Sequence, residues 1–267
     1  MNFEKITSRS NPLIKEAAKL SDKKHREKTG LFAFEGRKLL AEALQLGAPL
    51  ENIFVTEKAL PIISEMDIKC RITLVSDEVY EKISFEKSPE GIFCVSKALD
   101  KLHNLFIIDR REHFSDGSIF ILDGIRDPGN LGTVLRTASA FGCGAVIMSD
   151  DCADIYNSKT VRASMGAIFR QRTLRTSDLP ATVTHLRKNG RIVYAAALDK
   201  SSLSLFDIKV DSNVCFIVGN EGNGIRREVI DACDASVIIP MEESTESLNA
   251  AMASTVLLYE QYRQKSL

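Results

Sequence analysis

Long apolar runs are missing from this sequence. No uninterrupted apolar stretch approaches the roughly 20 residues that cross a bilayer, and the start, Met1-Asn2-Phe3-Glu4-Lys5, lacks the apolar segment of a secretory signal. We therefore expect a soluble protein of the cytoplasm with no membrane partner. At 267 residues, of which 44% are hydrophobic, the chain is long enough for two modest domains, each with an apolar core.

Closely spaced cysteine pairs are missing as well. Zinc and redox sites commonly use two cysteines separated by two residues. None of the six cysteines stands in such a pair: Cys70, Cys94, Cys143, Cys152, Cys215 and Cys233. Because several of them lie inside apolar runs, we expect reduced, buried and unreactive thiols, and no metal site.

No charge of one sign dominates, because the formal net charge is −1. The first 40 residues differ from the rest, since ten Lys and Arg residues there face five Asp and Glu residues. A basic segment of this kind is typical of contact with nucleic-acid phosphates. A solvated helical face is the alternative explanation for this feature alone.

Residues 1–98 alternate helical and strand patterns, which predicts a small α/β domain. Asn11-Pro12 opens a helix with proline in its first turn, and the apolar spacing of residues 39–44 predicts another. Short β-forming runs predict four strands, at residues 31–34, 53–55, 72–75 and 91–95. The charged residues 99–117 are predicted to be a linker, although residues 105–108 could add a strand.

Residues 118–267 alternate apolar runs with helical patterns, which is typical of a parallel sheet. Almost continuously apolar runs predict strands buried on both faces, at residues 119–122, 145–148, 192–196, 215–218 and 237–239. Helical patterns separate most of them, at residues 131–141, 158–170, 179–189 and 248–262. This half is therefore predicted to be an α/β domain, with no internal repeat.

Polar residues gather where three of these strands end. The segments are residues 127–138, residues 219–224, and residues 239–241 followed by 247–249. Parallel sheets collect their ligands at the carboxyl ends of their strands. We therefore interpret the three segments as one shared site.

The first segment joins a turn to a helix. Asp127-Pro128-Gly129-Asn130 is the turn, and the apolar stripe of the helix leaves Arg136 outside it. A guanidinium near the strand ends suits a phosphate or a developing oxyanion. An exposed arginine in a surface ion pair is the alternative.

Glycines in the second segment follow an apolar strand. Gly219, Gly222 and Gly224 are spaced G-x-x-G-x-G, whereas dinucleotide-binding enzymes use G-x-G-x-x-G, and no phosphate-binding lysine follows. This order disfavours a nicotinamide- or nucleotide-dependent enzyme. We expect backbone that passes close to a ligand, with Glu221 beside it. A plain glycine-rich turn is the simpler alternative.

The third segment precedes the last predicted helix. Ser247 is placed to cap that helix. Capping does not explain Asn249, a weak helix former whose amide could bind a hydroxyl or backbone group at this end.

Taken together, the segments resemble motifs one, two and three of the SpoU-type branch of the SPOUT RNA methyltransferases. The matching residues are Asn130-x-Gly-x-x-x-Arg136-Thr-Ala, Gly219-Asn-Glu221-Gly-x-Gly224, and Ile239-Pro240-Met241 followed by Glu246-Ser247-Leu248-Asn249. The resemblance implies an α/β fold with a trefoil knot at its carboxyl end, which connection rules alone exclude. It also implies methyl transfer from S-adenosylmethionine to a ribose 2′-hydroxyl by a homodimer without a metal.

The resemblance also implies roles for individual residues. The cofactor would be bound by Gly219, Ile239, Met241 and Leu248. The catalytic set would be Arg136, Asn130, Glu221, Ser247 and Asn249. Since a guanidinium is a poor base, we expect Arg136 to stabilise the forming alkoxide. Glu243 and Ala250 stand where many members have glycine and valine.

The amino-terminal half matches more loosely. Asn11-Pro12-x-x-Lys15 and Phe34-Glu35-Gly36-Arg37 resemble the ribosomal-protein-like substrate-binding domain of members that modify ribosomal RNA. The RNA-binding residues would be Arg9, Asn11, Lys15, Arg26 and Arg37. Ribosomal RNA is favoured as the substrate. There are two alternatives: a transfer RNA substrate, or a non-catalytic RNA-binding protein with a degenerate methyltransferase domain. The target nucleotide cannot be read from the protein sequence.

Overall fold

The computed structural model describes residues 5–99, 117–198, 201–242 and 247–265. The chain forms two compact units: unit 1 contains residues 1–99 and 154–170, and unit 2 contains residues 100–153 and 171–267. The predicted domains differ from these units in one segment. Residues 154–170 belong to the carboxyl-terminal half of the sequence but pack within unit 1. The strand considered at residues 105–108 lies outside the described residues.

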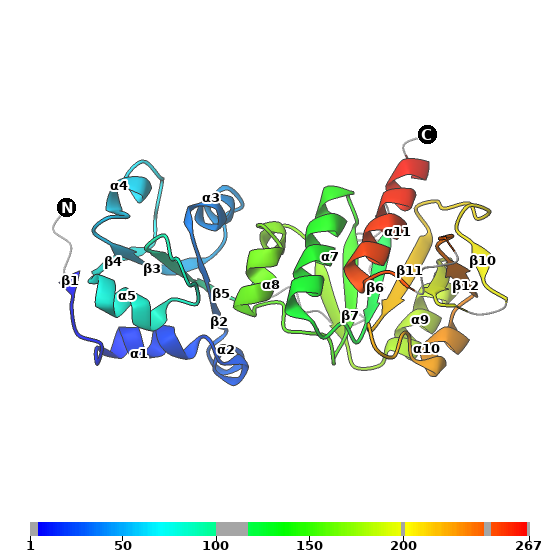
Figure 1. The fold of residues 1–267 in the computed structure, drawn as a ribbon, viewed down its shortest axis with the longest axis horizontal. Helices are drawn as coiled ribbons and strands as arrows, with labels where there is room; N and C mark the ends of the chain where they lie inside the picture. Colours follow the sequence, from blue (N-terminus) through cyan, green and yellow to red (C-terminus); the bar gives the residue numbers. More distant parts are fainter. Residues whose placement is uncertain (1–4, 100–116, 199–200, 243–246, 266–267) are drawn as a thin grey trace. The chain divides into compact units, whose positions relative to one another are not determined.

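Unit 1 is built on a mixed five-stranded sheet with the order β1-β4-β3-β5-β2 (Figure 1). Its strands are β1 (Lys5–Ile6), β2 (Leu31–Glu35), β3 (Leu50–Thr56), β4 (Arg71–Val75) and β5 (Ile92–Lys97). Strands β1, β4 and β3 are parallel, whereas β5 runs antiparallel to β3 and β2. The four strands predicted for this half are confirmed, and β1 is too short to leave a sequence pattern.

The helices of unit 1 cover this sheet. They are α1 (Pro12–Lys19), α2 (Lys23–Thr29), α3 (Arg37–Gln45), α4 (Leu60–Ile63), α5 (Asp77–Ile83), α8 (Ser158–Ala163) and the 3₁₀ helix η2 (Ala167–Phe169). Apolar side chains of α1 and α5 form one core with Ala33 of β2. Side chains alternate along a strand, so Phe32 and Phe34 point the other way. There they meet rings of residues 154–170, at centroid distances of 4.5 Å to Tyr156 and 5.1 Å to Phe169.

The single helix predicted over residues 158–170 is wrong, because the backbone turns at Met165 and Gly166. Met165 has a φ of 48° and Gly166 a φ of 89°, and such positive values end a right-handed helix. A Cβ at Gly166 would lie 2.8 Å from Cγ of Glu42 in α3. The turn therefore needs glycine at this position to approach α3.

Unit 2 contains a seven-stranded sheet in which every pair of neighbours is parallel, with the order β10-β12-β9-β11-β6-β7-β8. The strands are β6 (Ile119–Asp123), β7 (Ala145–Ser149), β8 (Thr173–Thr176), β9 (Ile192–Ala196), β10 (Leu203–Ser204), β11 (Val214–Gly219) and β12 (Ala235–Ile238). The parallel α/β fold and its five predicted strands are confirmed. Edge strands β8 and β10 escape prediction because they are short and partly polar.

Helices cover both faces of this sheet (Figure 1). They are α7 (Pro128–Ala140), α9 (Leu179–Lys188), α10 (Arg227–Ala232) and α11 (Ala250–Lys265). Helices α9 and α10 share a core with one face, and α7 packs beside α11. The trefoil knot stays a prediction, and residues 243–246, which include Glu243, lie outside the described residues.

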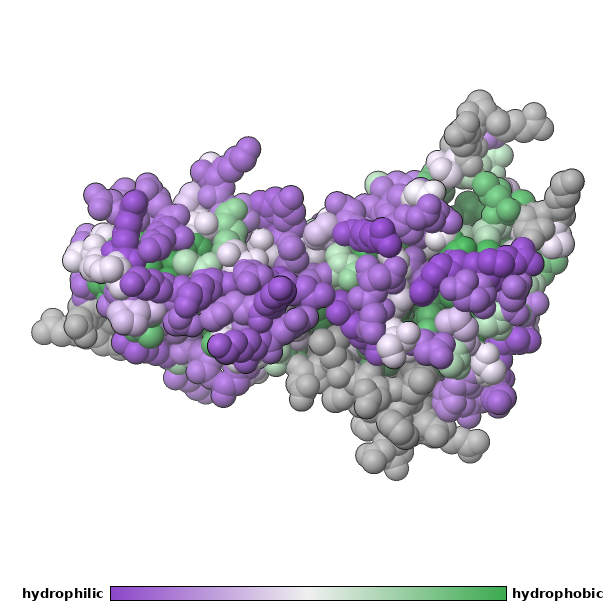
Figure 2. Space-filling model, turned by 90° about the horizontal axis from the view of Figure 1, so that it is seen from below, coloured by the Kyte–Doolittle hydropathy of each residue, from purple (hydrophilic) through white to green (hydrophobic). Residues whose placement is uncertain are grey.

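The hydropathy of the surface and the burial of the cysteines can be compared with the expectations from composition. Within the described ranges no helix is long and apolar enough to cross a membrane, and the face in Figure 2 is mostly hydrophilic. All six cysteines are free, and five of them are buried, as predicted. Burial raises the pKa of Cys143 to about 11 and that of Cys215 and Cys233 to about 12. These three thiols therefore stay protonated and weakly nucleophilic at neutral pH.

Candidate functional site

The site is built at the carboxyl ends of strands β6, β11 and β12. Asp127 caps α7, because its Oδ1 accepts the Asn130 N–H at 2.7 Å, and Pro128 occupies the first turn. This cap places Asn130 in the first turn of α7, directly after the β6 loop.

One chain of hydrogen bonds joins the three predicted motifs. The Asn130 amide donates to Oε1 of Glu221 in the second motif. The Asn249 amide in the third motif donates to Oδ1 of Asn130 at 3.3 Å. Residues that are 119 positions apart in the sequence are thereby held together. The structure thus brings three of the five predicted catalytic residues into one polar cluster.

Asn249 also caps the last helix, which corrects the role expected for Ser247. Oδ1 of Asn249 accepts the Ala251 N–H at 2.9 Å, and α11 begins at Ala250 rather than at residue 248. Ser247 therefore lies two residues before the cap and lines a cavity instead. The side-chain oxygen of Asn249 thus caps α11, and its side-chain nitrogen donates a hydrogen bond to the polar cluster.

The second motif folds into a tight glycine loop. The backbones of Asn220 and Gly224 exchange two hydrogen bonds, at 3.0 and 2.8 Å, and the Asn220 amide donates to the Gly124 carbonyl at 2.8 Å. A Cβ at Gly219 would lie only 2.2 Å from the Gly224 carbonyl carbon. Only glycine allows the backbone to close so tightly at this point.

A cavity of about 420 Å³ opens beside this loop. All four residues predicted to bind the cofactor line it: Gly219, Ile239, Met241 and Leu248. Glu221 and Ser247 of the predicted catalytic set line it too, as does Ala250, one of the two departures from the family pattern. Pockets of this size with mainly apolar walls and a few polar groups hold small organic ligands. The lining fits S-adenosylmethionine, because its apolar side chains would hold the apolar parts of the cofactor and its loop backbone and Glu221 would bind polar groups.

Arg136 lies outside that cavity. It is exposed on α7 and makes no hydrogen bond or ion pair with any residue of the described ranges. The surface ion pair that was the alternative explanation is therefore not seen there.

An ion pair that the sequence analysis missed supports two of the motif loops. Asp123, at the end of β6, is 2% exposed. Its carboxylate accepts the backbone N–H of Arg226 at 2.9 Å and the guanidinium at 2.6 and 2.8 Å. The hydrogen bond to Asp123 is the main reason that the pKa of Arg226 is raised. Neither residue belongs to a motif. The one sequence signal for this pair is Asp123 itself, a charged residue at the end of an apolar strand.

The residues predicted to contact RNA have different environments in unit 1. Lys15 and the Arg37 side chain are exposed. The Asn11 side chain caps α1 by accepting the Leu13 N–H at 2.9 Å. Arg9 donates to the Glu78 carbonyl at 2.9 Å and is still exposed. For these four residues, contact with RNA stays a prediction.

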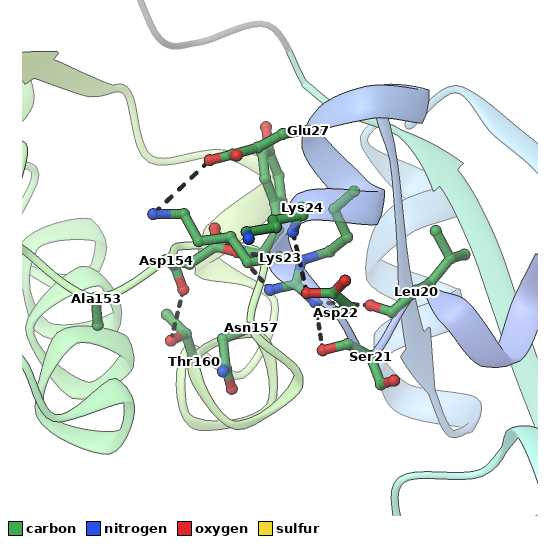
Figure 3. A network of polar contacts seen from close by, with 12 residues as sticks. Leu20, Ser21, Asp22, Lys23, Lys24, Glu27, Ala153, Asp154, Asn157 and Thr160 are labelled. Carbon is green, nitrogen blue, oxygen red and sulfur yellow. Dashed lines mark hydrogen bonds and ion pairs between the residues drawn. The ribbon is translucent and has the colours of Figure 1, made fainter.

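Arg26 is the exception, because its side chain is buried rather than exposed, and its contact with RNA stays a prediction. Its side chain is 6% exposed and forms an ion pair with Asp154 at 2.6 Å. It also donates to the carbonyls of Leu20 and Ser21, at 2.7 and 2.9 Å. Figure 3 labels three of its partners, Leu20, Ser21 and Asp154. Four hydrogen bonds occupy four of the five N–H groups of this buried guanidinium, which leaves one for any further ligand.

Known proteins resemble this chain over nearly its whole length. The 23S rRNA (guanosine(2553)-2′-O)-methyltransferase RlmP of Bacillus subtilis is 31% identical over 258 residues, which cover 96% of this chain and 98% of that protein. An AdoMet-bound rRNA methyltransferase from Sinorhizobium meliloti is 28% identical with a TM-score of 0.82, covering 98% of both chains. The structure of an RNA 2′-O ribose methyltransferase is 29% identical with a TM-score of 0.82, covering 99% of this chain and 100% of that one.

Two family models divide the chain between them. Residues 11–94 match the MRM3-like substrate binding domain. Residues 117–259, more than half of the chain, match the SpoU rRNA Methylase family and contain all three motifs. The chain belongs to the SpoU rRNA methylase family.

Proposed function

We propose that this protein transfers a methyl group from S-adenosylmethionine to a ribose 2′-hydroxyl of RNA, with ribosomal RNA as the favoured substrate. The hydrogen-bonded chain of Glu221, Asn130 and Asn249, which joins three family motifs and reaches the cofactor cavity through Glu221, is the observation that carries this proposal. The AdoMet-bound relative from Sinorhizobium meliloti supports the choice of cofactor.

Each part of the site has a distinct task in this reaction. S-adenosylmethionine supplies an activated methyl group on a positively charged sulfur. Gly219, Ile239, Met241 and Leu248 hold the donor, and the polar cluster positions the acceptor, because alignment alone can contribute roughly 7 to 11 kcal/mol to a transfer. Arg136 stabilises the alkoxide that develops as the hydroxyl loses its proton.

We propose that the active form is a homodimer in which a second copy completes the site. Arg136 lies outside the cavity of its own chain, which supports a site that a second copy completes. Helix α11 exposes an apolar stripe at helical spacing, made of Met252 (59% exposed), Val256 (37%), Tyr259 (50%) and Tyr262 (47%). A continuous apolar stripe on a charged surface marks an interface.

Unit 1 is proposed to supply affinity for the RNA. Its match to a substrate-binding family and its exposed cations, Lys15, Arg9 and Arg37, support this task. Neutralising phosphates with such cations releases counterions, so binding should weaken steeply as salt rises. The expected cytoplasmic location follows from a ribosomal RNA substrate and stays a prediction.

Methyl transfer in vitro tests this proposal. The purified protein is incubated with radiolabelled S-adenosylmethionine and either unmodified ribosomal RNA or transfer RNA, and the RNA is digested to nucleosides. We expect a labelled 2′-O-methylnucleoside from ribosomal RNA. Label in transfer RNA alone would move the substrate to the alternative class. A labelled base, or no label with either RNA, would refute the proposed reaction.

A further inference from the structure

A second cavity, of about 480 Å³, lies within unit 1. It is bounded by the end of β2, by α3, by the loop between α5 and β5, and by the turn after α8. Most of its lining falls inside residues 11–94, which match the substrate-binding family model. A cavity of this volume accommodates a group as large as a nucleotide.

Carboxylates and apolar side chains share the lining of this cavity. The carboxylates are those of Glu35, Glu42, Glu86 and Glu90. Three of them already have partners: Tyr80, Ser84 and the Phe85 N–H for Glu35, Arg170 for Glu42, and Arg162 for Glu86. Two of the four carboxylates, those of Glu42 and Glu86, therefore have their charge offset by an arginine, whereas neutral donors hold Glu35.

Glu90 is the remaining carboxylate, and it is held in place by one oxygen only. Its Oε2 accepts the backbone N–H of Arg37, the first residue of α3, at 2.8 Å. Its Oε1 accepts no hydrogen bond from any residue in the described ranges. The cavity thus presents one oriented hydrogen-bond acceptor that a ligand can use.

The other groups suit a flat aromatic ring attached to a phosphate chain. Leu39, Pro89 and Met165 supply apolar lining, and a methionine thioether makes favourable contacts with aromatic rings. Lys38, which also lines the cavity, and Arg37 are exposed and can meet phosphates.

We propose that this cavity binds one unstacked base of the substrate RNA and that Oε1 of Glu90 accepts a hydrogen bond from the exocyclic amino group of that base. The inference rests on the proposed function and adds a base preference to it. Sequence-specific RNA recognition relies on bases splayed out of helices, and carboxylates accept from the cytosine amino group. Uracil carries a carbonyl oxygen at the same position, which a carboxylate oxygen repels.

The substitution Glu90→Gln makes this preference testable. The amide oxygen of glutamine replaces Oε2 as acceptor of the Arg37 N–H, which turns the amide nitrogen toward the cavity. That nitrogen donates a hydrogen bond, so it favours the uracil carbonyl and disfavours the cytosine amino group. A merely structural role of Glu90 would not reverse a base preference.

Fluorescence anisotropy with labelled cytidine and uridine decamers measures the effect on the full-length protein. We expect the wild type to bind the cytidine decamer about fivefold more tightly, as one hydrogen bond supplies. Glu90→Gln should reverse the preference and Glu90→Ala should abolish it. Ala41→Phe, which fills the cavity from its exposed rim, should weaken binding of both decamers.

Glu65→Gln, an exposed carboxylate away from the cavity, is the matched control and should behave as the wild type. Equal binding of both decamers by the wild type, binding of neither, or an unchanged ratio in Glu90→Gln would overturn the base site. Methyl transfer is measured separately. An active enzyme without a base preference refutes this inference alone, whereas a base preference without methyl transfer refutes the proposed function alone.

Discussion

Arg136 is the residue on which the proposed chemistry depends most. Replacing it with alanine removes the charge that stabilises the forming alkoxide, and loss of one such group typically slows a reaction about 10² to 10³-fold. We expect this loss in single-turnover methyl transfer. Binding of S-adenosylhomocysteine, measured by calorimetry, should be unchanged because Arg136 does not line the cofactor cavity.

Arg136→Lys is the matched variant, since it keeps the charge and loses the planar donor geometry. Its rate should fall between those of the wild type and Arg136→Ala. Loss of cofactor binding in a folded Arg136→Ala protein would assign the residue to the cofactor loops instead.

Glu35 gives unit 1 a specific pH dependence. Burial raises its pKa above the ordinary 4.5, although hydrogen bonds from Phe85, Ser84 and Tyr80 act in the opposite direction. A carboxyl whose pKa is raised in the folded state binds more protons when folded than when unfolded. Its contribution to stability therefore falls as the pH rises from the unfolded-state pKa to the folded-state pKa.

Glu35→Gln removes this titration. We expect the free energy of unfolding of the wild type, minus that of Glu35→Gln, to fall as pH is raised from about 4.5, because the wild-type carboxylate ionises in a buried place. Urea unfolding of both proteins over a pH series measures the difference. A difference that rises with pH would show that the hydrogen bonds outweigh burial.

At the scale of elements, the segment of residues 154–170 is held in unit 1 by a buried charge. Removing one partner of a buried ion pair leaves the other uncompensated and typically costs roughly 3 to 5 kcal/mol. Since Asp154 keeps 16% of its side chain exposed, we expect Arg26→Ala to lower the free energy of unfolding by about 3 kcal/mol. Urea denaturation checks this value.

Lys24→Ala on the same helix is the control, because its side chain is exposed. A surface substitution of this kind changes stability by less than about 0.5 kcal/mol. Equal unfolding midpoints for the two variants would show that Arg26 does not anchor the segment.

The sequence predicts elements better than it predicts their partners. Apolar runs of the β6 and β11 type mark strands because a parallel sheet buries both faces. Periodicity carries no long-range information, so it could not reveal that Phe32 and Phe34 pack on residues 154–170, or that Arg26 is buried. The motif residues were placed by resemblance, and their spacing alone does not reveal the bonds among Glu221, Asn130 and Asn249.

At the scale of the whole molecule, the apolar stripe on α11 predicts a dimer. Met252→Glu places a charge on this stripe without disturbing a core, since Met252 is 59% exposed. We expect the variant to sediment as a monomer that still binds S-adenosylhomocysteine and no longer transfers methyl groups. Leu46→Glu, at a position 42% exposed in unit 1, is the control and should remain dimeric and active.

A Met252→Glu protein that stays dimeric would place the interface elsewhere. A monomer with full activity would show that one chain forms a complete site, and Arg136 would then need a route to the cavity within its own chain.

The central claim is that this chain methylates a ribose of RNA in the cell, and mapping 2′-O-methylated riboses tests it most directly. Ribosomal and transfer RNA are compared between cells that lack the gene and cells that carry either the wild type or Arg136→Ala. We predict that one ribose of ribosomal RNA loses its methyl group without the gene and regains it only with the wild type. Identical maps in all three strains would contradict the account.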